Sequence, residues 1–350
     1  MLPFGMNETT ILTDTADLVR PNPRTATAWQ KALREAIRDP RELCRVLDLS
    51  ADYEAAAVRA AEDFPLFVPR GYAGRIRRGD PHDPLLRQVL PLDAERADLA
   101  GFAVDPVGDA PAALVPGLLQ KYQGRALMVT TGACAVHCRY CFRRHYPYSD
   151  GPRALDDWEP ALRRIAADPS LDEVLLSGGD PLTLVDDWLA RLARRLAAIP
   201  HLRRLRVHTR LPIVVPERVC GELIEWLRGT RLATIVVVHA NHPAELDEAV
   251  AGALARLVDA GVVVLNQSVL LRGVNDQADV LVKLCRRLVD LRVMPYYLHQ
   301  LDRVQGAAHF EVPVEVGLAL AAEMRARLPG YAVPRYVREV AGETHKFVLA

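Results

Sequence analysis

Apolar and polar residues follow two alternating patterns along this 350-residue chain from residue 120 onward. Short apolar runs, typical of buried strands, are followed by longer segments in which apolar residues recur every three or four positions, as in amphipathic helices. The predicted strands are residues 126–130, 173–176, 205–208, 234–239, 262–267 and 292–298. The predicted helices are residues 156–167, 185–198, 216–228, 244–260, 277–291 and 313–328. Strands that are nearly all apolar and alternate with helices indicate a parallel sheet covered by helices, hence an α/β fold.

The first hundred residues follow a different pattern. Helical spacing of apolar residues predicts helices over residues 26–38, 40–47 and 51–63. Residues 67–72 and 79–87 are dense in proline and glycine, which predicts ordered turns. We therefore expect a helical and wrapping segment over residues 1–110, a core over residues 111–330 and a C-terminal segment over residues 331–350.

Six strand–helix units are too few for the closed barrel of eight units. A three-quarter barrel is the natural result. The carboxyl ends of parallel strands are where such folds place their active sites, so chemistry is expected in the segments that follow the strands.

Charge and composition narrow the possible functions. Lysine plus arginine and aspartate plus glutamate both number 44, so no overall field attracts nucleic acid or an anionic membrane. The first residues have no pattern of a secretory signal, and no stretch is long enough to span a membrane. Cys44, Cys220 and Cys285 are isolated in helical patterns and are predicted to be buried thiols of a cytoplasmic protein.

Three other cysteines cluster directly after the strand predicted at residues 126–130. Cys134, Cys138 and Cys141 have the spacing C-x3-C-x2-C, which can surround one iron–sulfur cluster and leave one iron without a protein ligand. An open coordination position distinguishes a reactive metal centre from a structural one. Two alternatives stay open on this loop alone: a zinc site that adds His145, and chance clustering.

Polar and glycine-rich segments follow the other predicted strands. Residues 177–180 are Ser-Gly-Gly-Asp, and glycines there would let a ligand lie against the backbone. Histidines follow two neighbouring strands, at His208, His239 and His242, and predict a polar pocket. Asp302 brings a carboxylate to the same rim.

These motifs resemble a known family. The cysteine spacing with Tyr140 before the third cysteine is similar to that of the radical S-adenosylmethionine (radical SAM) enzymes. Residues 141–144, 175–180, 266–275, 295–297 and 331–334 together resemble the lysine 2,3-aminomutase family, over roughly residues 65 to 346. This resemblance implies a partial (β/α)6 radical SAM barrel with an N-terminal helical extension. It also implies three cofactors: a [4Fe-4S] cluster, S-adenosylmethionine (SAM) and pyridoxal 5'-phosphate (PLP).

The resemblance further implies a role for each matching residue. The cluster would be held by Cys134, Cys138 and Cys141, and SAM by Ser177, Gly178, Gly179, Asp180 and His239. PLP would be bound covalently by Lys346, with phosphate contacts from Lys121, Arg125, Arg210 and Gln267. The substrate carboxylate would be bound by Arg143 and its distal ammonium by Asp302 and Glu339. Without the resemblance, Lys346 would be interpreted as a solvated tail residue, and Lys121 and Arg125 as an exposed pair.

The implied activity is that of an isomerase that converts L-α-lysine to (R)-β-lysine, with an electron donor such as flavodoxin or ferredoxin. Residues 141–148 and 301–310 most resemble the family branch that serves β-lysylation of elongation factor P. There a separate ligase attaches the product, so direct contact with the factor is not needed. The alternatives are a 2,3-aminomutase for another amino acid, synthesis of free β-lysine, and a zinc-binding interaction module. Residues 341–345 depart from the glycine-rich run of the classical enzymes.

Overall fold

A ten-stranded sheet forms the centre of the computed structural model, which describes residues 27–350. Each strand pairs with its neighbours along the chain, so the order in the sheet is the order in the sequence. The strands are β1 (Ala113–Val115), β2 (Leu118–Tyr122), β3 (Arg125–Val129), β4 (Glu173–Ser177), β5 (Arg204–His208), β6 (Ala233–His239), β7 (Val263–Val269), β8 (Met294–His299), β9 (Arg335–Arg338) and β10 (Phe347–Val348).

The pairs from β3 through β9 are all parallel, whereas β1, β2 and β10 are added antiparallel at the two sides. Because β1 and β10 each have only one neighbour, the barrel is open between these two strands. The α/β class and all six predicted strands are confirmed. The four additional strands were not predicted because they are short, two to five residues long, and short runs have little periodicity.

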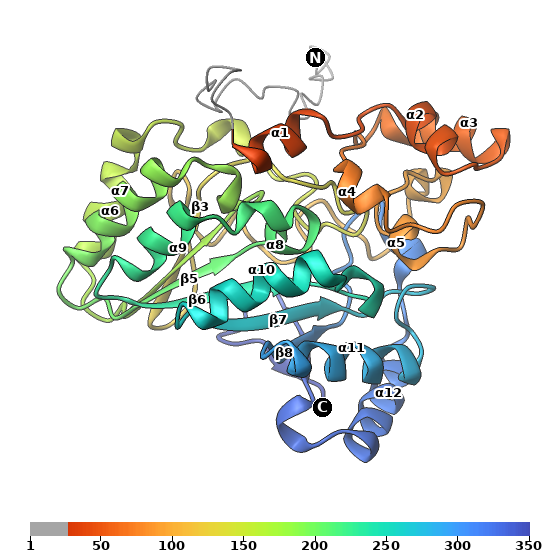
Figure 1. The fold of residues 1–350 in the computed structure, drawn as a ribbon. Coiled ribbons are helices and arrows are strands. Elements are labelled where there is room, and N and C mark those ends of the chain that lie inside the picture. Colours follow the sequence, from red (N-terminus) through yellow and green to blue (C-terminus); the bar gives the residue numbers. More distant parts are fainter. Residues whose placement is uncertain (1–26) are drawn as a thin grey trace, which may run out of the picture.

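Helices cover the outer face of the sheet, as Figure 1 shows for α10 in front of β5 to β7. They are α6 (Glu159–Ala166), α7 (Asp186–Ala197), α8 (Leu211–Val214), α9 (Gly221–Arg228), α10 (Glu248–Asp259), α11 (Ala278–Asp290) and α12 (Val314–Arg327). The apolar stripe predicted from the sequence explains this packing: α7 buries Leu189, Leu192, Ala193 and Leu196, which lie on one face. The long predicted helices are confirmed, with ends that differ by a few residues.

The N-terminal part runs along one rim of the barrel (red to orange in Figure 1). Its helices are α1 (Ala28–Arg34), α2 (Pro40–Val46), α3 (Ala51–Ala61), α4 (Arg70–Ala73) and α5 (Pro84–Arg87). The turns after α3 hydrogen-bond to the cysteine loop, where His137 N donates to Phe67 O and Arg139 N donates to Gln88 O. Residues 1–26, where the absence of a secretory signal was predicted, lie outside the described residues.

The inner face of the barrel is more polar than the sequence predicted. Along β5, Leu205 and Val207 are buried against the helices, whereas Arg204, Arg206 and His208 alternate with them and stay partly accessible. His239 on β6 and Gln267 on β7 are likewise half-buried and are paired in register. The barrel interior therefore presents polar side chains to a ligand. No helix within residues 27–350 is long and apolar enough to cross a bilayer.

Candidate active site

The cysteine loop leaves the carboxyl end of β3 and lies against the loop that follows β4. Cys134, Cys138 and Cys141 are half-buried free thiols, and Cys141 N donates to Cys138 O in a tight turn. Burial raises the pKa of the Cys134 thiol and raises that of Cys141 to about 11. With raised pKa values both groups are protonated thiols at pH 7, so they would release their protons on binding a metal cluster as thiolates.

Two glycines allow this close packing. Gly179 N donates to Thr131 O, and Asp180 N donates to Ala133 O, both at 2.7 Å. A Cβ added to Gly179 would lie 2.3 Å from Ala133 O, and one added to Gly178, whose φ is +128°, would lie 2.5 Å from Thr131 O. The glycines were predicted to make room for a ligand. In the structure they make room for the backbone of the cysteine loop.

The carboxylate of Asp180 is hydrogen-bonded to other groups of the protein. Its carboxylate accepts hydrogen bonds from Thr209 Oγ1 and from the backbone N–H groups of Leu182, Arg210 and Leu211. Burial nevertheless raises the pKa of this carboxyl group, because it outweighs these hydrogen bonds. The side chain ties the loop after β4 to the loop after β5, so its oxygens are already engaged.

Arg210 places a positive charge beside one of the three thiols. Arg210 Nη1 lies 2.8 Å from Cys138 Sγ, and its Nη2 donates to Gln88 Oε1 and Glu245 Oε2. Arg139, which is fully buried, pairs with Glu95 at 2.6 Å. Cations near thiolates stabilise the anionic form, which suits a cluster of bound cysteinates.

His145 is engaged away from the thiols. Its Nε2 lies 3.1 Å from the backbone oxygen of Gln305. Among residues 27–350, no three histidine, cysteine, aspartate or glutamate side chains converge tightly enough to enclose a single metal ion. An iron–sulfur cluster is wider than one ion, because each cysteine binds a different iron. The contact of His145 with Gln305 thus argues against the zinc site with this histidine.

Three histidines at the carboxyl ends of β5, β6 and β8 face the barrel interior. His239 stacks on Tyr140, with ring centroids 5.7 Å apart, and its Nε2 lies 3.0 Å from the tyrosine hydroxyl. Burial lowers the pKa of His239 to about 3 and also lowers those of His208 and His299, so all three are neutral at pH 7. The Nε2 atoms of His208 and His299 are buried without a hydrogen-bond partner. Such orphaned polar atoms fit a site that binds a polar cofactor.

A cluster of opposite charges lies where the two sides of the open barrel meet. Lys346 Nζ donates to Glu339 Oε2, and Tyr122 Oη at the end of β2 donates to Glu339 Oε1 at 2.5 Å. Burial disfavours the charge on Glu339, but Lys346 and Tyr122 outweigh it and hold the pKa of Glu339 below its usual range. Lys346 is half-buried, whereas residues 341–345 before it are exposed. The lysine therefore turns inward from an exposed segment.

Asp302 completes this charged cluster after β8. Burial raises its pKa to about 7, against the opposing effect of Lys346. The charge of Glu339 adds to the rise, whereas that of Lys121 opposes it. Asp302 and Glu339, the two residues predicted to bind the substrate ammonium, thus both lie near Lys346.

Arg143 is held by a residue that the sequence did not single out. Asp109, on the loop before β1, accepts from Arg143 Nε at 2.7 Å and forms an ion pair with Lys121 Nζ at 2.7 Å. Arg143 Nη1 also donates to Ser177 Oγ at 3.1 Å. Asp109 lies in a turn-rich segment without periodicity, and nothing in the sequence distinguishes it from the neighbouring Asp105.

The four residues predicted to contact the phosphate have different surroundings. Arg125 stacks its guanidinium 4.5 Å from the Tyr122 ring centre, and Gln267 lies on the inner face of β7. Lys121 is occupied by Asp109 and by the backbone oxygen of Val107. Arg210 lies beside Cys138, on the cluster side. The Nε atom of Arg210 is buried without a hydrogen-bond partner.

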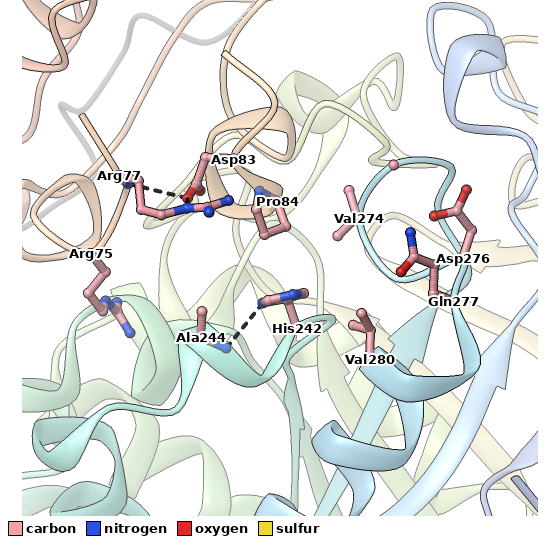
Figure 2. Close-up of a pocket in the computed structure, with 11 residues that line it drawn as sticks. Arg75, Arg77, Asp83, Pro84, His242, Ala244, Val274, Asp276, Gln277 and Val280 are labelled. Carbon is pink, nitrogen blue, oxygen red and sulfur yellow. Dashed lines mark hydrogen bonds and ion pairs between the residues drawn. The ribbon is translucent and has the colours of Figure 1, made fainter. Parts of the chain in front are cut away.

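A separate recess lies outside the barrel, beside the segments that follow β6 and β7 (Figure 2). It has a volume of about 450 Å³ and is lined by Arg75, Arg77, Asp83, Pro84, His242, Ala244, Gly273, Val274, Asp276, Gln277 and Val280. Neither the three cysteines nor Lys346 line it. It is therefore not the candidate active site.

Comparison with known proteins agrees with this arrangement. Residues 128–285 match the model of the Radical SAM superfamily. The chain is 46% identical over 335 residues to the L-lysine 2,3-aminomutase of Escherichia coli (strain K12), covering 95% of this chain and 98% of that protein. The chain belongs to the L-lysine 2,3-aminomutase family.

Two other members show the breadth of the match. The L-lysine 2,3-aminomutase of Haemophilus influenzae is 44% identical, covering 92% of this chain and 95% of that protein. The L-lysine 2,3-aminomutase of Clostridium subterminale is 34% identical, covering 90% of this chain and 76% of that protein. Family membership confirms the predicted radical SAM fold, isomerase class, and cofactor set of [4Fe-4S] cluster, SAM and PLP. A small-molecule substrate and a reductant follow from this chemistry.

Proposed function

We propose that this protein is an L-lysine 2,3-aminomutase that converts L-α-lysine to (R)-β-lysine. The observation that carries the proposal is the contact between Glu339 and Lys346, because Glu339 binds the ammonium of a lysine side chain. Once Lys346 is engaged with PLP, Glu339 is free to bind the distal ammonium of a substrate lysine. Asp302 lies close enough to add a second negative charge.

The same acidic pair disfavours other substrates. An amino acid with an acidic side chain would be repelled by two carboxylates in a partly buried site. A basic side chain shorter than that of lysine would not reach the two carboxylates. The two carboxylates therefore favour lysine over glutamate as the substrate.

The remaining roles follow from position. Cys134, Cys138 and Cys141 would hold the cluster, and Arg143, two residues after Cys141 and beside Ser177, would bind the substrate carboxylate. Arg125 and Gln267 would contact the phosphate of PLP, and the unpartnered ring nitrogens of His208 and His299 would face the bound cofactors. When bound, the cluster and SAM supply a radical that removes a substrate hydrogen, and PLP carries the migrating amino group. Lys346 Nζ must lose a proton to bind PLP, and Glu339 Oε2 is placed to accept it.

The test is anaerobic reaction of the reconstituted protein with L-lysine, SAM and a chemical reductant, followed by chiral chromatography of the product. We expect (R)-β-lysine. Parallel reactions with L-glutamate, L-ornithine and L-arginine test the alternative substrates, and faster turnover of any of these would overturn the proposal. Lys346→Ala should abolish turnover, whereas Lys283→Ala, which changes an exposed lysine on α11, should not.

We further propose that the product serves β-lysylation of elongation factor P, with flavodoxin or ferredoxin as electron donor. The support is the similarity of residues 141–148 and 301–310 to the corresponding family branch. Expression in a bacterium that lacks its own aminomutase should restore the mass increase of the factor. Accumulation of free β-lysine without modification of the factor would favour the alternative, synthesis of the free amino acid.

A further inference from the structure

Asp109 is a buried carboxylate that contacts two cationic side chains, those of Arg143 and Lys121. The family resemblance assigns these two side chains to the substrate carboxylate and to the PLP phosphate. Only 2% of its surface is exposed. Its Oδ2 accepts from Arg143 Nε, and its Oδ1 pairs with Lys121 Nζ, both at 2.7 Å. Burial disfavours the charged form, but Arg143 and Lys121 outweigh it, so the pKa of Asp109 lies below its usual range. Asp109 is thus an anion at every pH at which the enzyme would work.

The loop that carries Asp109 is itself fixed. The carboxylate of Asp105 accepts from Asp109 N and Ala110 N, both at 2.9 Å. Ala103 N donates to Arg303 O, and Gln305 N donates to Ala103 O, so the loop is tied to the segment that follows Asp302. A carboxylate held in this way can fix the orientation of a neighbouring guanidinium.

The contacts of Arg143 leave one edge of its guanidinium available. Nε of Arg143 donates to Asp109 Oδ2, and Nη1 donates one hydrogen to Ser177 Oγ. The ring of Phe142 lies 4.8 Å from the guanidinium carbon and limits its rotation. The remaining N–H groups, on Nη2 and Nη1, form the edge that can bind a carboxylate bidentately.

We propose that Asp109 is a positioning residue, which orients Arg143 to bind the α-carboxylate of the amino acid substrate, and that Lys121 balances the charge of Asp109 instead of contacting a phosphate. This inference rests on the proposed function. It also explains why Lys121 has two short contacts within the protein. A phosphate dianion placed on Lys121 would lie next to the carboxylate of Asp109 and be repelled by it.

The test compares two ligands that differ only at the carboxylate. L-Lysine and L-lysinamide are titrated by calorimetry into the PLP-reconstituted protein and into its Asp109→Asn variant. We expect the variant to bind L-lysine roughly tenfold more weakly and L-lysinamide about equally well, because only the carboxylate needs an oriented Arg143. A merely structural role would weaken both ligands alike, and that result would overturn the inference.

Three controls keep the result interpretable. In an Arg143→Lys background, Asp109→Asn should cause little further loss for L-lysine, since the two residues act as a unit. Asp259→Asn removes an exposed carboxylate that pairs with Arg292 at 2.6 Å, and should leave both affinities unchanged. Lys121→Gln should leave the PLP affinity nearly unchanged, and a large loss of PLP would overturn the part of the inference that concerns Lys121. Failure of the wild-type protein to bind L-lysine at all would instead contradict the proposed function.

Discussion

Arg210 Nη1 lies 2.8 Å from the sulfur of Cys138, while Nη2 of the same guanidinium donates to Glu245 at 2.8 Å. One buried arginine thus connects the cysteine loop with the segment after β6. Glu245 is fully buried, and it also accepts hydrogen bonds from Gln88 Nε2 and from Asn241 N.

Arg210→Leu should therefore destabilise the protein strongly. It leaves Glu245 buried without its cation, which costs about 3–5 kcal/mol. Chemical denaturation should show a lower midpoint, and the double variant Arg210→Leu with Glu245→Gln should recover part of the loss. Arg292→Leu, which breaks an exposed ion pair, should change the midpoint little. Equal effects of the buried and exposed substitutions would contradict this prediction.

Gly179→Ala should reduce the iron content of the purified protein. The added Cβ would collide with backbone oxygens of Gly132 and Ala133, at 2.7 and 2.3 Å, and displace the loop that carries Cys134. Gly252→Ala is the matched control, because nothing lies within 4 Å of its Cβ in the middle of α10. That control should keep its iron and gain roughly 0.5–1 kcal/mol of stability. Normal iron content in Gly179→Ala would show that the loops need not pack so closely.

Asp302 should make lysine binding dependent on pH. Its folded pKa of about 7 lies above the usual value near 3.8. Because the folded state holds the proton more tightly, this group favours folding at low pH, and the contribution is lost as pH rises from about 4 through 7. Only the charged form of Asp302 attracts an ammonium group, so the affinity for L-lysine should rise as the pH increases through 7. In Asp302→Asn this pH dependence should disappear, and the variant should bind L-lysine roughly tenfold more weakly at pH 8. Calorimetry at pH 6 and pH 8 measures both effects; a pH dependence that persists in Asp302→Asn would assign it to another group, such as Lys346 or Glu339.

His145→Gln should leave the iron content unchanged. His145 contacts the backbone oxygen of Gln305, and glutamine can keep that hydrogen bond. Metal analysis of protein purified without oxygen checks the prediction, with Cys141→Ala as the variant that should lose iron. A loss of bound metal in His145→Gln would support the histidine as a ligand.

The sequence predicted the elements of the barrel because burial and periodicity are local properties. The apolar face of α7 and the run that forms β6 need no knowledge of the rest of the chain. Strand β10 has two residues, Phe347 and Val348, and forms only because β9 offers it an edge. Short elements of this kind depend on tertiary contacts and have no periodic signal.

The site was predicted less completely, for the same physical reason. The cysteine spacing lies within one loop and is visible in the sequence. The partners of Arg143 and Lys121 are brought together only by folding, so Asp109 could not be identified. The role of Ser177, Gly178 and Gly179 in holding SAM stays a prediction, and the packing of the two glycines against the cysteine loop is visible only in the fold. A motif indicates that a position is constrained, and only the fold identifies the neighbour that constrains it.

The order of the strands has a consequence for assembly. Every backbone ladder in the sheet joins segments that are neighbours along the chain, so the sheet can grow by successive addition without a long search. The hydrogen bond from Tyr122 to Glu339 instead spans 217 positions. It is made by side chains alone and needs both flanks of the sheet in place. The amides on either side of this junction should therefore open with a lower free energy, measured by hydrogen exchange, than the amides of β4 to β7. The contact between Tyr122 and Glu339 would then be among the first to break when the barrel opens.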